Sequence, residues 1–483
     1  MNIVVVGMGY VGIPCAVLLA DVPGFRVMGV QRRSERSGWK IECLNAGRCP
    51  FEGEEPGLAE LIHRVAVEKG TFRVTDDYEV CKEADAILID VQTPTDGDHV
   101  PHYDSLCEVS VQIGRHLRPG TLVVVESTVA PGTIQNVLQP ILERESGLKG
   151  GQDFYLAFSY ERVMPGKLLE YLTDFPRVVG GIDEESTRRA VELYRNIVKR
   201  EITPTDVLTA EMAKVVENAY RDVNIAFANE VALACERMGV NVFEVRELVN
   251  ARPDRHMHIP GAGVGGHCLP KDSWLLAHGL EIYGRRADRD TAGRTEGDIR
   301  ISQSIARIII LAREINDGMP SHMVRLVEDA LAEAGRELVR AKVVLLGAAY
   351  LENADDTRNT PAAMLAKLLL ARGAEVVAHD PYVREADWRR ALGEERPRDQ
   401  GLGRTQEGEV SDLPAVPLIN DLWKALEGAD CVALVTRHGE YTTLDPWRLK
   451  GVMRTLVLVD GRNVFNPNKW VEAGFAVRMV GKG

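Results

Sequence analysis

The strongest constraint on the fold is a glycine pattern that follows the short β-branched run Asn2-Ile-Val-Val-Val-Gly7. The pattern, Gly7-Met-Gly-Tyr-Val-Gly12, leads into an apolar helical stretch at residues 13–20. In a strand–turn–helix unit the first glycine permits the tight turn, and the second lets backbone N–H groups reach a pyrophosphate. The third allows the helix to pack closely on the strand. Its position between a strand and a helix predicts a dinucleotide-binding Rossmann domain, rather than an unrelated glycine-rich turn.

The end of the second expected strand, residues 25–31, bears on the choice of cofactor. An acidic residue at this point binds the 2′-OH of NAD, but this chain has Gln31, followed by Arg32 and Arg33. Arginines here are able to hold a 2′-phosphate, although they are also ordinary surface charges. The fingerprint therefore predicts NAD and leaves NADP open.

A second informative feature is the stretch Gly261-Ala-Gly-Val-Gly-Gly-His-Cys-Leu-Pro-Lys-Asp272. Its glycines allow the backbone to approach a ligand closely, and a lysine and an aspartate follow Cys268 within four residues, where a thiolate could use their charge. The eight cysteines show no CxxC spacing, which is typical of reduced thiols. The stretch predicts a nucleophilic cysteine, and with the fingerprint it predicts a redox enzyme that uses a covalent thiol.

The hydrophobic pattern predicts an α/β chain with two Rossmann-like doubly wound domains joined by a long-helix central domain. In the expected N-terminal domain (1–204), strands at 86–91, 121–125 and 154–158 alternate with amphipathic stretches.

The period becomes helical in the expected central domain (205–335). One long helix is expected to reach Ala234, and a second helical region spans 301–333, punctuated by Gly318 and Pro320. A large shared helical surface favours a homodimer or a higher homo-oligomer.

The expected C-terminal domain (336–483) repeats the strand–helix rhythm, with strands at 342–347, 374–380, 431–435 and 456–460. It has Gly347-Ala-Ala-Tyr350 where the fingerprint would stand, so we expect a nucleotide domain that does not bind the dinucleotide. A polar segment at 390–417 is expected to be a mobile surface excursion.

Composition narrows the class of protein. With 483 residues the chain is longer than one hydrophobic core usually supports, so two or three domains are expected. Its formal net charge of -13 argues against a nucleic-acid partner. No apolar run has membrane-spanning length, and the first residues lack the features of a secretory signal. We therefore expect a cytoplasmic enzyme without a membrane partner.

Further motifs occur along nearly the whole chain. Besides the fingerprint and the cysteine stretch they are Glu54-Glu-Pro-Gly-Leu58, Glu126-Ser-Thr-Val-Ala-Pro-Gly-Thr133, Glu161-Arg-Val-Met-Pro-Gly166, Ala210-Glu-Met-Ala-Lys214, Glu217-Asn-Ala-Tyr-Arg221, Asn224-Ile-Ala, Asn229-Glu230 and Asp355-Asp-Thr-Arg358. In these motifs and in their order the chain resembles the UDP-glucose/GDP-mannose dehydrogenase family, the nucleotide-sugar 6-dehydrogenases. The resemblance implies oxidation of a sugar C6 alcohol to a carboxylate with two NAD per turnover.

The resemblance also implies the catalytic roles. Cys268 would trap the intermediate aldehyde as a thiohemiacetal, and a second oxidation would give a thioester that water hydrolyses. Lys214 and Asn218 lie four residues apart, on one face of the long helix, and family membership would put them beside C6 with Lys214 stabilising the alkoxide. Asp272 would position Lys214 and water, whereas Glu161 matches the family's general base. Thr128 would hold water through its hydroxyl.

The ligand contacts implied by the resemblance form two sets. The cofactor set is Gly7, Gly9, Tyr10, Val11, Gly12, Gln31, Arg32, Thr93, Thr128 and Arg358. The substrate set is Glu161, Arg162, Val163, Lys214, Asn218, Arg221, Gly265, His267, Tyr350 and Arg462. Two positions depart from the family pattern: Pro165 replaces a second glutamate, and Tyr350-Leu351 replaces an aromatic residue followed by lysine.

The form of the cysteine stretch and of the motif after Glu161 resembles members that oxidise UDP-N-acetylhexosamines. UDP-N-acetylmannosamine and UDP-N-acetylglucosamine fit equally, with UDP-glucose as an alternative and GDP-mannose a lesser one. Three other classes compete: a one-step dehydrogenase, a non-catalytic NAD-binding protein, and a zinc hydrolase using His256, His258, His267 and Cys268. The last set matches no structural zinc spacing, so no metal is predicted.

Overall fold

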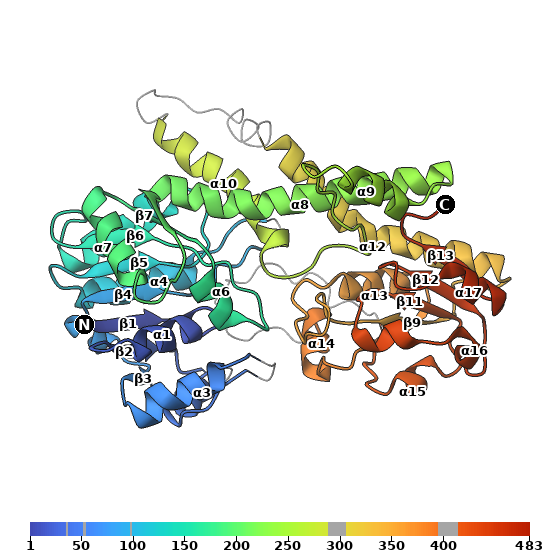
Figure 1. Cartoon of the computed structure of the whole chain (residues 1–483), viewed down its shortest axis with the longest axis horizontal. Coiled ribbons are helices and arrows are strands. Elements are labelled where there is room, and N and C mark those ends of the chain that lie inside the picture. Colours follow the sequence, from blue (N-terminus) through green and yellow to red (C-terminus); the bar gives the residue numbers. More distant parts are fainter. Residues whose placement is uncertain (35–36, 52–54, 97–98, 288–305, 395–413) are drawn as a thin grey trace. The chain divides into compact units, whose positions relative to one another are not determined.

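The structure is a computed structural model that describes residues 1–34, 37–51, 55–96, 99–287, 306–394 and 414–483 (Figure 1). The chain forms two compact units. Unit 1 comprises Met1–Asn218 and Lys271–Ala306, and unit 2 comprises Ala219–Pro270 and Arg307–Gly483. Of the polar segment predicted at 390–417, residues 395–413 lie outside the described residues.

Unit 1 contains an eight-stranded sheet in the order β3-β2-β1-β4-β5-β6-β7-β8. Apart from the antiparallel pair β6–β7, neighbouring strands are parallel. The first six follow the order of a dinucleotide-binding Rossmann sheet, in which ligands bind at the carboxyl ends of the strands. The strands are β1 (Asn2–Val6), β2 (Arg26–Val30), β3 (Phe72–Thr75), β4 (Ala86–Ile89), β5 (Leu122–Val125), β6 (Tyr155–Phe158), β7 (Arg177–Gly181) and β8 (Ile202–Asp206).

Helices cover both faces of this sheet, and their apolar sides form two buried clusters with the alternate faces of the strands (Figure 1). Val5 on β1 contributes to one cluster and Val4 to the other, as expected for a strand buried on both faces. The helices are α1 (Gly12–Asp21), α2 (Trp39–Asn45), α3 (Leu58–His63), α4 (Asp104–His116), α5 (Gln139–Ser146), α6 (Leu168–Asp174) and α7 (Glu184–Tyr194), with short turns η1 (Arg64–Glu68), η2 (Tyr78–Glu83) and η3 (Ile134–Leu138). Helix α10 (Leu269–Ala287) belongs to unit 1 from Lys271 onward.

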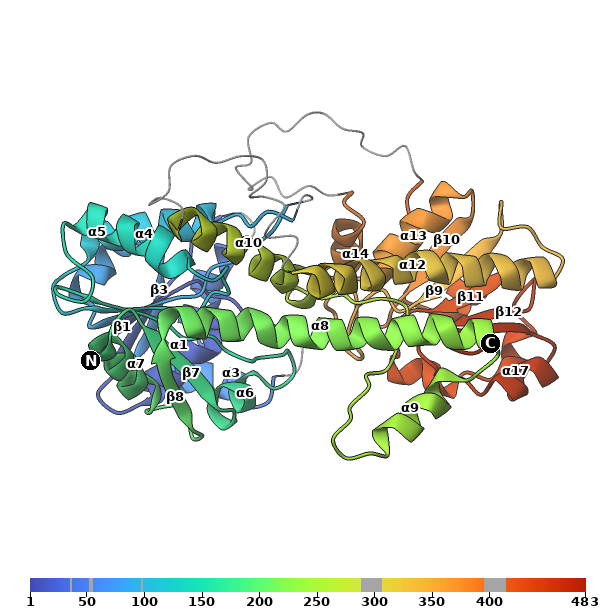
Figure 2. The same cartoon turned by 90° about the horizontal axis from the view of Figure 1, so that it is seen from above.

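The predicted long helix is α8 (Val207–Met238), which contributes residues to both units. In unit 2 it pairs with α12 (Arg307–Glu333), and the two run side by side in the same direction (Figure 2). Hydrogen bonds join Asp222 to Arg313, Asn229 to Asn316 and Glu236 to His322. The short helix α9 (Val242–Asn250) follows α8. None of the helices in the described ranges is long and apolar enough to cross a membrane.

Helix α12 corrects one prediction, because it continues through Gly318 and Pro320 instead of being punctuated there. A proline inside a helix removes one hydrogen bond, but Pro320 is buried and its neighbours Met319 and Met323 belong to the core of unit 2. Tertiary packing of the apolar face therefore outweighs the local preference.

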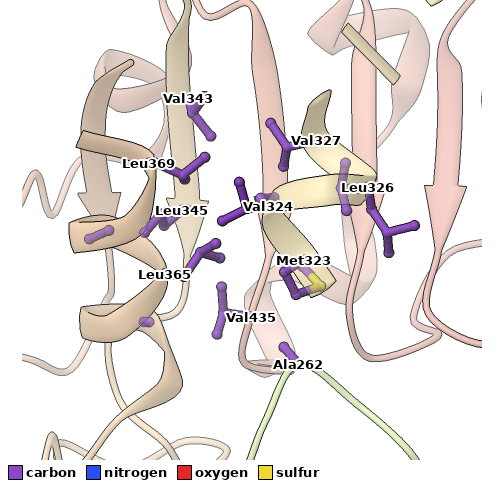
Figure 3. Packing of buried hydrophobic residues seen from close by; sticks show 14 of the residues in the cluster. Ala262, Met323, Val324, Leu326, Val327, Val343, Leu345, Leu365, Leu369 and Val435 are labelled. Carbon is purple, nitrogen blue, oxygen red and sulfur yellow. The ribbon is translucent and has the colours of Figure 1, made fainter. Parts of the chain in front are cut away.

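Unit 2 carries a parallel five-stranded sheet in the order β10-β9-β11-β12-β13. In its core, side chains of α12 pack with those of the helix at Pro361–Ala371 and of the strand at Lys342–Leu346. Val324, Leu365 and Leu345 lie close together there (Figure 3). The strands are β9 (Lys342–Leu346), β10 (Glu375–His379), β11 (Cys431–Leu434), β12 (Val457–Asp460) and β13 (Ala476–Met479). The helices are α13 (Pro361–Ala371), α14 (Glu385–Ala391), α15 (Leu422–Leu426), α16 (Pro446–Leu449) and α17 (Pro467–Glu472), with the turn η5 (Gly439–Thr443).

Candidate active site

The glycine-rich turn after β1 has the geometry that a dinucleotide requires. Gly7 has a φ of +106°, and a Cβ added there would lie 2.2 Å from the carbonyl oxygen of Asp90. A Cβ at Gly12 would lie 2.0 Å from the carbonyl oxygen of Gly7, whereas nothing lies within 4 Å of one at Gly9. The turn is thus closed against the sheet and open at Gly9, just before the N-terminus of α1, so its residues fit an NAD pyrophosphate.

Beside this turn, the side chains of Gln31 and Arg33 at the end of β2 already have partners. The Gln31 amide oxygen accepts the backbone N–H of Met8 at 3.2 Å. Arg33 forms ion pairs with Glu42 at 2.9 Å and with Asp76 at 3.0 Å. Arg32 is exposed. Two carboxylates would therefore compete with a 2′-phosphate for Arg33, one of the two arginines at this point.

The loops after β4 and β5 meet through Thr93 and Thr128, both expected at the cofactor. The Thr93 hydroxyl donates to the Thr128 carbonyl oxygen at 2.6 Å. It also accepts from Lys271 Nζ at 3.2 Å, and the Lys271 side chain is almost fully buried. Lys271 was not among the predicted site residues. Its only signal in the sequence is its position three residues after Cys268.

The structure brings together four predicted catalytic residues of unit 1 in two pairs. Lys214 Nζ donates to the Glu161 carbonyl oxygen at 2.7 Å and lies 4.0 Å from its carboxylate oxygen Oε1. One helical turn further on, Asn218 Nδ2 donates to Asp272 Oδ2 at 2.6 Å. Lys214 and Asp272 are 6% and 1% exposed, so their charges are held in place by the protein.

The second carboxylate oxygen of Asp272 is notable because it is buried and accepts no hydrogen bond from a group that the structure describes. Lys271 Nζ lies 3.5 Å from this oxygen, Oδ1. Buried carboxylate oxygens are nearly always hydrogen-bonded, to protein or to ordered water. An acceptor of this kind beside Asn218 is suited to a water molecule or a sugar hydroxyl.

The loop that carries Glu161 is held from several sides. Its Arg162 binds Glu217 at 2.9 Å, and the Glu161 carboxylate accepts the N–H of Val163. From the Glu54-Glu-Pro-Gly-Leu58 motif, Glu55 accepts the N–H groups of Gly166 at 2.5 Å and Leu168 at 3.0 Å. The motif had no predicted role, and its contacts cross more than a hundred residues of sequence.

Glu211 is a further residue that sequence reasoning missed. It lies on α8 one turn before Lys214, is fully buried, and its two oxygens accept the N–H groups of Gly132 at 2.8 Å and Ile134 at 2.9 Å. It thereby anchors the loop of Thr128 to the helix of Lys214. Burial raises the pKa of Glu211 to about 8, because the two N–H donors offset only part of the lost hydration.

The raised pKa of Glu211 predicts a pH dependence of stability. Its usual value is 4.5, so between about pH 4.5 and 8 the folded protein holds a proton there that the unfolded chain releases. The stability that Glu211 contributes through this proton is fully present below pH 4.5 and is lost as the pH rises through 8. The free energy of unfolding changes by up to a few kcal/mol over this range. We expect the thermal midpoint of Glu211→Gln to fall less between pH 5 and 9 than that of the unsubstituted protein. The exposed Glu60→Gln serves as the control, and equal slopes for all three proteins would contradict the assignment.

In unit 2, the cysteine loop (residues 261–268) presents Cys268. This residue is exposed, whereas each of the other cysteines is buried or half-buried. The Gly266 N–H donates to the Arg358 carbonyl oxygen at 2.8 Å, and Asn359 Nδ2 donates to the Gly266 carbonyl oxygen at 3.0 Å. The Tyr350 ring lies against the same turn, since a Cβ on Gly266 would lie 2.9 Å from it.

The predicted arginines of unit 2 have defined partners. Arg462 Nε donates to the Val435 carbonyl oxygen at 2.6 Å, and its Nη2 to that of Gly263 at 3.4 Å, so the guanidinium supports the cysteine loop. Arg358 pairs with Asp356 at 2.5 Å. Burial raises the pKa of the Tyr350 hydroxyl to about 12.

The remaining residues predicted in unit 2 differ in exposure. Arg221 on α8 is exposed, and His267 is half-buried next to Cys268. The rings of His256 and His258 meet edge to face, 5.0 Å apart. Within the described residues, no group of three histidine, cysteine or carboxylate side chains could hold a metal ion. The predicted site residues therefore fall into one set in each unit.

Family models match three parts of the chain. Three models of the UDP-glucose/GDP-mannose dehydrogenase family match: the NAD binding domain at residues 1–198, the central domain at 208–291 and the UDP binding domain at 344–467.

Relatives match over the whole chain. The UDP-N-acetyl-D-mannosamine dehydrogenase of Pyrococcus horikoshii is 35% identical over 100% of both chains. The crystal structure of an NDP-N-acetyl-D-galactosaminuronic acid dehydrogenase from Methanosarcina mazei is 40% identical, with a TM-score of 0.82 over 100% of this chain and 95% of that one. A UDP-glucose dehydrogenase from Pyrobaculum islandicum is 28% identical, with a TM-score of 0.78 over 100% of this chain and 98% of that one. The chain thus belongs to the UDP-glucose/GDP-mannose dehydrogenase family and is an NAD-dependent nucleotide-sugar dehydrogenase.

Proposed function

We propose that this protein oxidises the C6 alcohol of a UDP-N-acetylhexosamine to the carboxylate in two steps, through a covalent intermediate on Cys268. The observation that carries the proposal is the contrast between the exposed Cys268, on a loop clamped at Gly266, and the more buried remaining cysteines. A thiol that is exposed on a fixed loop is suited to attack a carbonyl carbon.

The proposed chemistry gives each residue a task. Lys214, held by the Glu161 carbonyl oxygen, stabilises the alkoxide that forms at C6, and Asn218 and Asp272 orient the hydroxyl or water. The Cys268 sulfur then adds to the aldehyde carbon. After the second oxidation the resulting thioester is cleaved by water, with Glu161 as the general base. When bound, NAD accepts the hydride that leaves C6 in each oxidation.

Two observations support the choice of sugar. Relatives that match along the entire chain carry the name UDP-N-acetyl-D-mannosamine dehydrogenase, and the Methanosarcina mazei structure is named for an N-acetylated uronic acid. The cysteine stretch and the motif after Glu161, which resemble those of members that oxidise UDP-N-acetylhexosamines, support the same class of sugar. We therefore propose UDP-N-acetylmannosamine as the substrate, with UDP-N-acetylglucosamine as the alternative.

For the cofactor we propose NAD over NADP. A 2′-phosphate would need a free guanidinium at the end of β2, but Arg33 is engaged by both Glu42 and Asp76. Gln31 is uncharged, so it offers no positive charge to a 2′-phosphate, and its amide oxygen supports the glycine-rich turn. The exposed Arg32 is the remaining candidate for weak NADP binding.

The test is to titrate each nucleotide sugar to exhaustion and to count the reduced cofactor by its absorbance, with NAD and NADP in parallel. The sugars are UDP-N-acetylmannosamine, UDP-N-acetylglucosamine, UDP-glucose and GDP-mannose. We expect two NADH per UDP-N-acetylmannosamine and at least a 10-fold higher kcat/KM with NAD than with NADP, a factor that corresponds to about 1.4 kcal/mol.

The outcomes separate the alternatives. One NADH per sugar would identify a one-step dehydrogenase, and activity with UDP-glucose alone would change the substrate but leave the covalent route in place. An absence of reduction with every sugar would favour a binding protein.

A further inference from the structure

A line of buried polar side chains connects α12 to the start of the cysteine loop. Arg313 Nη1 donates to Asp222 Oδ1 at 2.6 Å, and Asn316 Nδ2 donates to the same oxygen at 2.8 Å. Asn229 Nδ2 donates to Asn316 Oδ1 at 2.8 Å, and the Gly261 N–H donates to Asn229 Oδ1 at 2.9 Å. All four side chains are at most 1% exposed.

The charged end of this line fixes the orientation of both amides. Arg313 can only donate hydrogen bonds, and Asp222 accepts one from it through a carboxylate oxygen. The same oxygen can accept from Asn316 only if Asn316 turns its NH₂ group toward it. The oxygen of Asn316 then faces Asn229 and requires the NH₂ group of that residue. Asn229 must therefore turn its own oxygen toward Gly261, where the loop offers an N–H.

The cysteine loop depends on such contacts because it lacks a helix or strand of its own. Its Ala262 is buried in the hydrophobic core near Met323 (Figure 3). At its other end Gly266 is held by the Arg358 backbone and by Asn359. At the end of the loop next to α8, Asn229 holds Gly261 and the Arg462 guanidinium supports Gly263. The position of Asn229 therefore sets where the loop that leads to Cys268 begins.

We propose that Asn229 is a positioning residue for the Cys268 nucleophile and that the line through Asn316 and Asp222 to Arg313 fixes the orientation of its amide. The inference rests on the proposed function, which makes Cys268 the nucleophile. A small displacement of a reacting atom lowers the rate of a positioned reaction by up to about 100-fold. Substitution of Asn229 should therefore change the reactivity of Cys268 and the rate of the chemical step more than it changes ligand binding.

The test compares Asn229→Ala with the unsubstituted protein in two assays. The first is alkylation of Cys268 by iodoacetamide without substrate, followed by mass spectrometry. The second is steady-state kinetics. We expect the alkylation rate to change several-fold and kcat to fall by about 10-fold or more, while the KM for NAD stays within about two-fold. Unchanged alkylation and kcat would overturn the proposal.

A matched variant separates positioning from general loss of stability. Leu331→Ala opens a cavity in the hydrophobic core of unit 2. Leu331 lies on α12, the helix that also carries Arg313 and Asn316, but it belongs to a cluster of apolar side chains. Leu331→Ala should lower the thermal midpoint without changing the alkylation of Cys268, and an equal change in both variants would show a structural role only. Asn224→Ala, on α8, is a second control, because that amide donates only locally to the Tyr220 carbonyl oxygen.

If Asn229→Ala does not fold, Asn316→Ala takes its place. It leaves the contact between Asn229 and Gly261 but removes the partner that orients the amide, so the same changes are expected at smaller size. Because alkylation is read at Cys268 without turnover, its result is independent of whether Cys268 is the catalytic nucleophile. The Cys268→Ser variant tests that assignment separately.

Discussion

Cys268→Ser is expected to end production of the carboxylate and to leave at most one NADH per sugar. A serine hydroxyl is a far weaker nucleophile than a thiolate near neutral pH, so the aldehyde would not be captured and no thioester would form. We expect kcat for the complete reaction to fall at least about 1,000-fold, which corresponds to roughly 4 kcal/mol of lost stabilisation of the transition state. The measurement is the ratio of NADH to sugar together with detection of the uronate.

The control for this substitution is Cys107→Ser, which changes a half-buried cysteine on α4. It should retain two NADH per sugar. In the unsubstituted protein Cys268 should also be the thiol that is alkylated fastest, and the nucleotide sugar should protect it. Formation of two NADH per sugar by Cys268→Ser would refute the covalent route.

The strands show which parts of the fold could be predicted. Continuous β-branched runs identified the central strands β1, β4 and β5, because strands buried on both faces carry little other than apolar residues. The sequence did not reveal β3, β7, β8 or β13. Three of these are edge strands, and β8 has polar residues and Pro204 that are exposed or half-buried. β8 therefore lacks the apolar run on which the prediction of a strand depends.

The site shows a comparable limit. The spacing of Lys214 and Asn218 correctly placed both on α8, because helical periodicity is a local property. Their partners Glu161 and Asp272 came from the resemblance, and the structure pairs them across 53 and 54 residues of sequence. The contacts of Lys271, Glu211 and Asn229 were not predicted. Each depends on a tertiary hydrogen bond to a distant loop, for which residue spacing carries no signal.

Lys214→Ala is the substitution of unit 1 with the largest expected effect. The ammonium group is almost fully buried, donates to the Glu161 carbonyl oxygen at 2.7 Å and lies 5.3 Å from the centre of the Tyr160 ring. A charge held in this way needs no rearrangement when negative charge forms on the C6 oxygen. Removal of one such donor costs about 100-fold to 1,000-fold in kcat, and we expect a loss of this size with little change in the KM for NAD.

The pH profile distinguishes this electrostatic role from a loss of structure. Without Lys214 the alkoxide must form without the cation proposed to stabilise it, so hydroxide in the solvent should partly replace the missing stabilisation. The rate of Lys214→Ala should therefore rise with pH more steeply than that of the unsubstituted enzyme between about pH 7 and 10. Lys199→Ala removes an exposed lysine that pairs with Asp174, and it should change neither kcat nor the profile. A Lys214→Ala enzyme with kcat within about 10-fold of the original and the same pH profile would remove Lys214 from the reaction and would leave the alkoxide to be stabilised by Asn218.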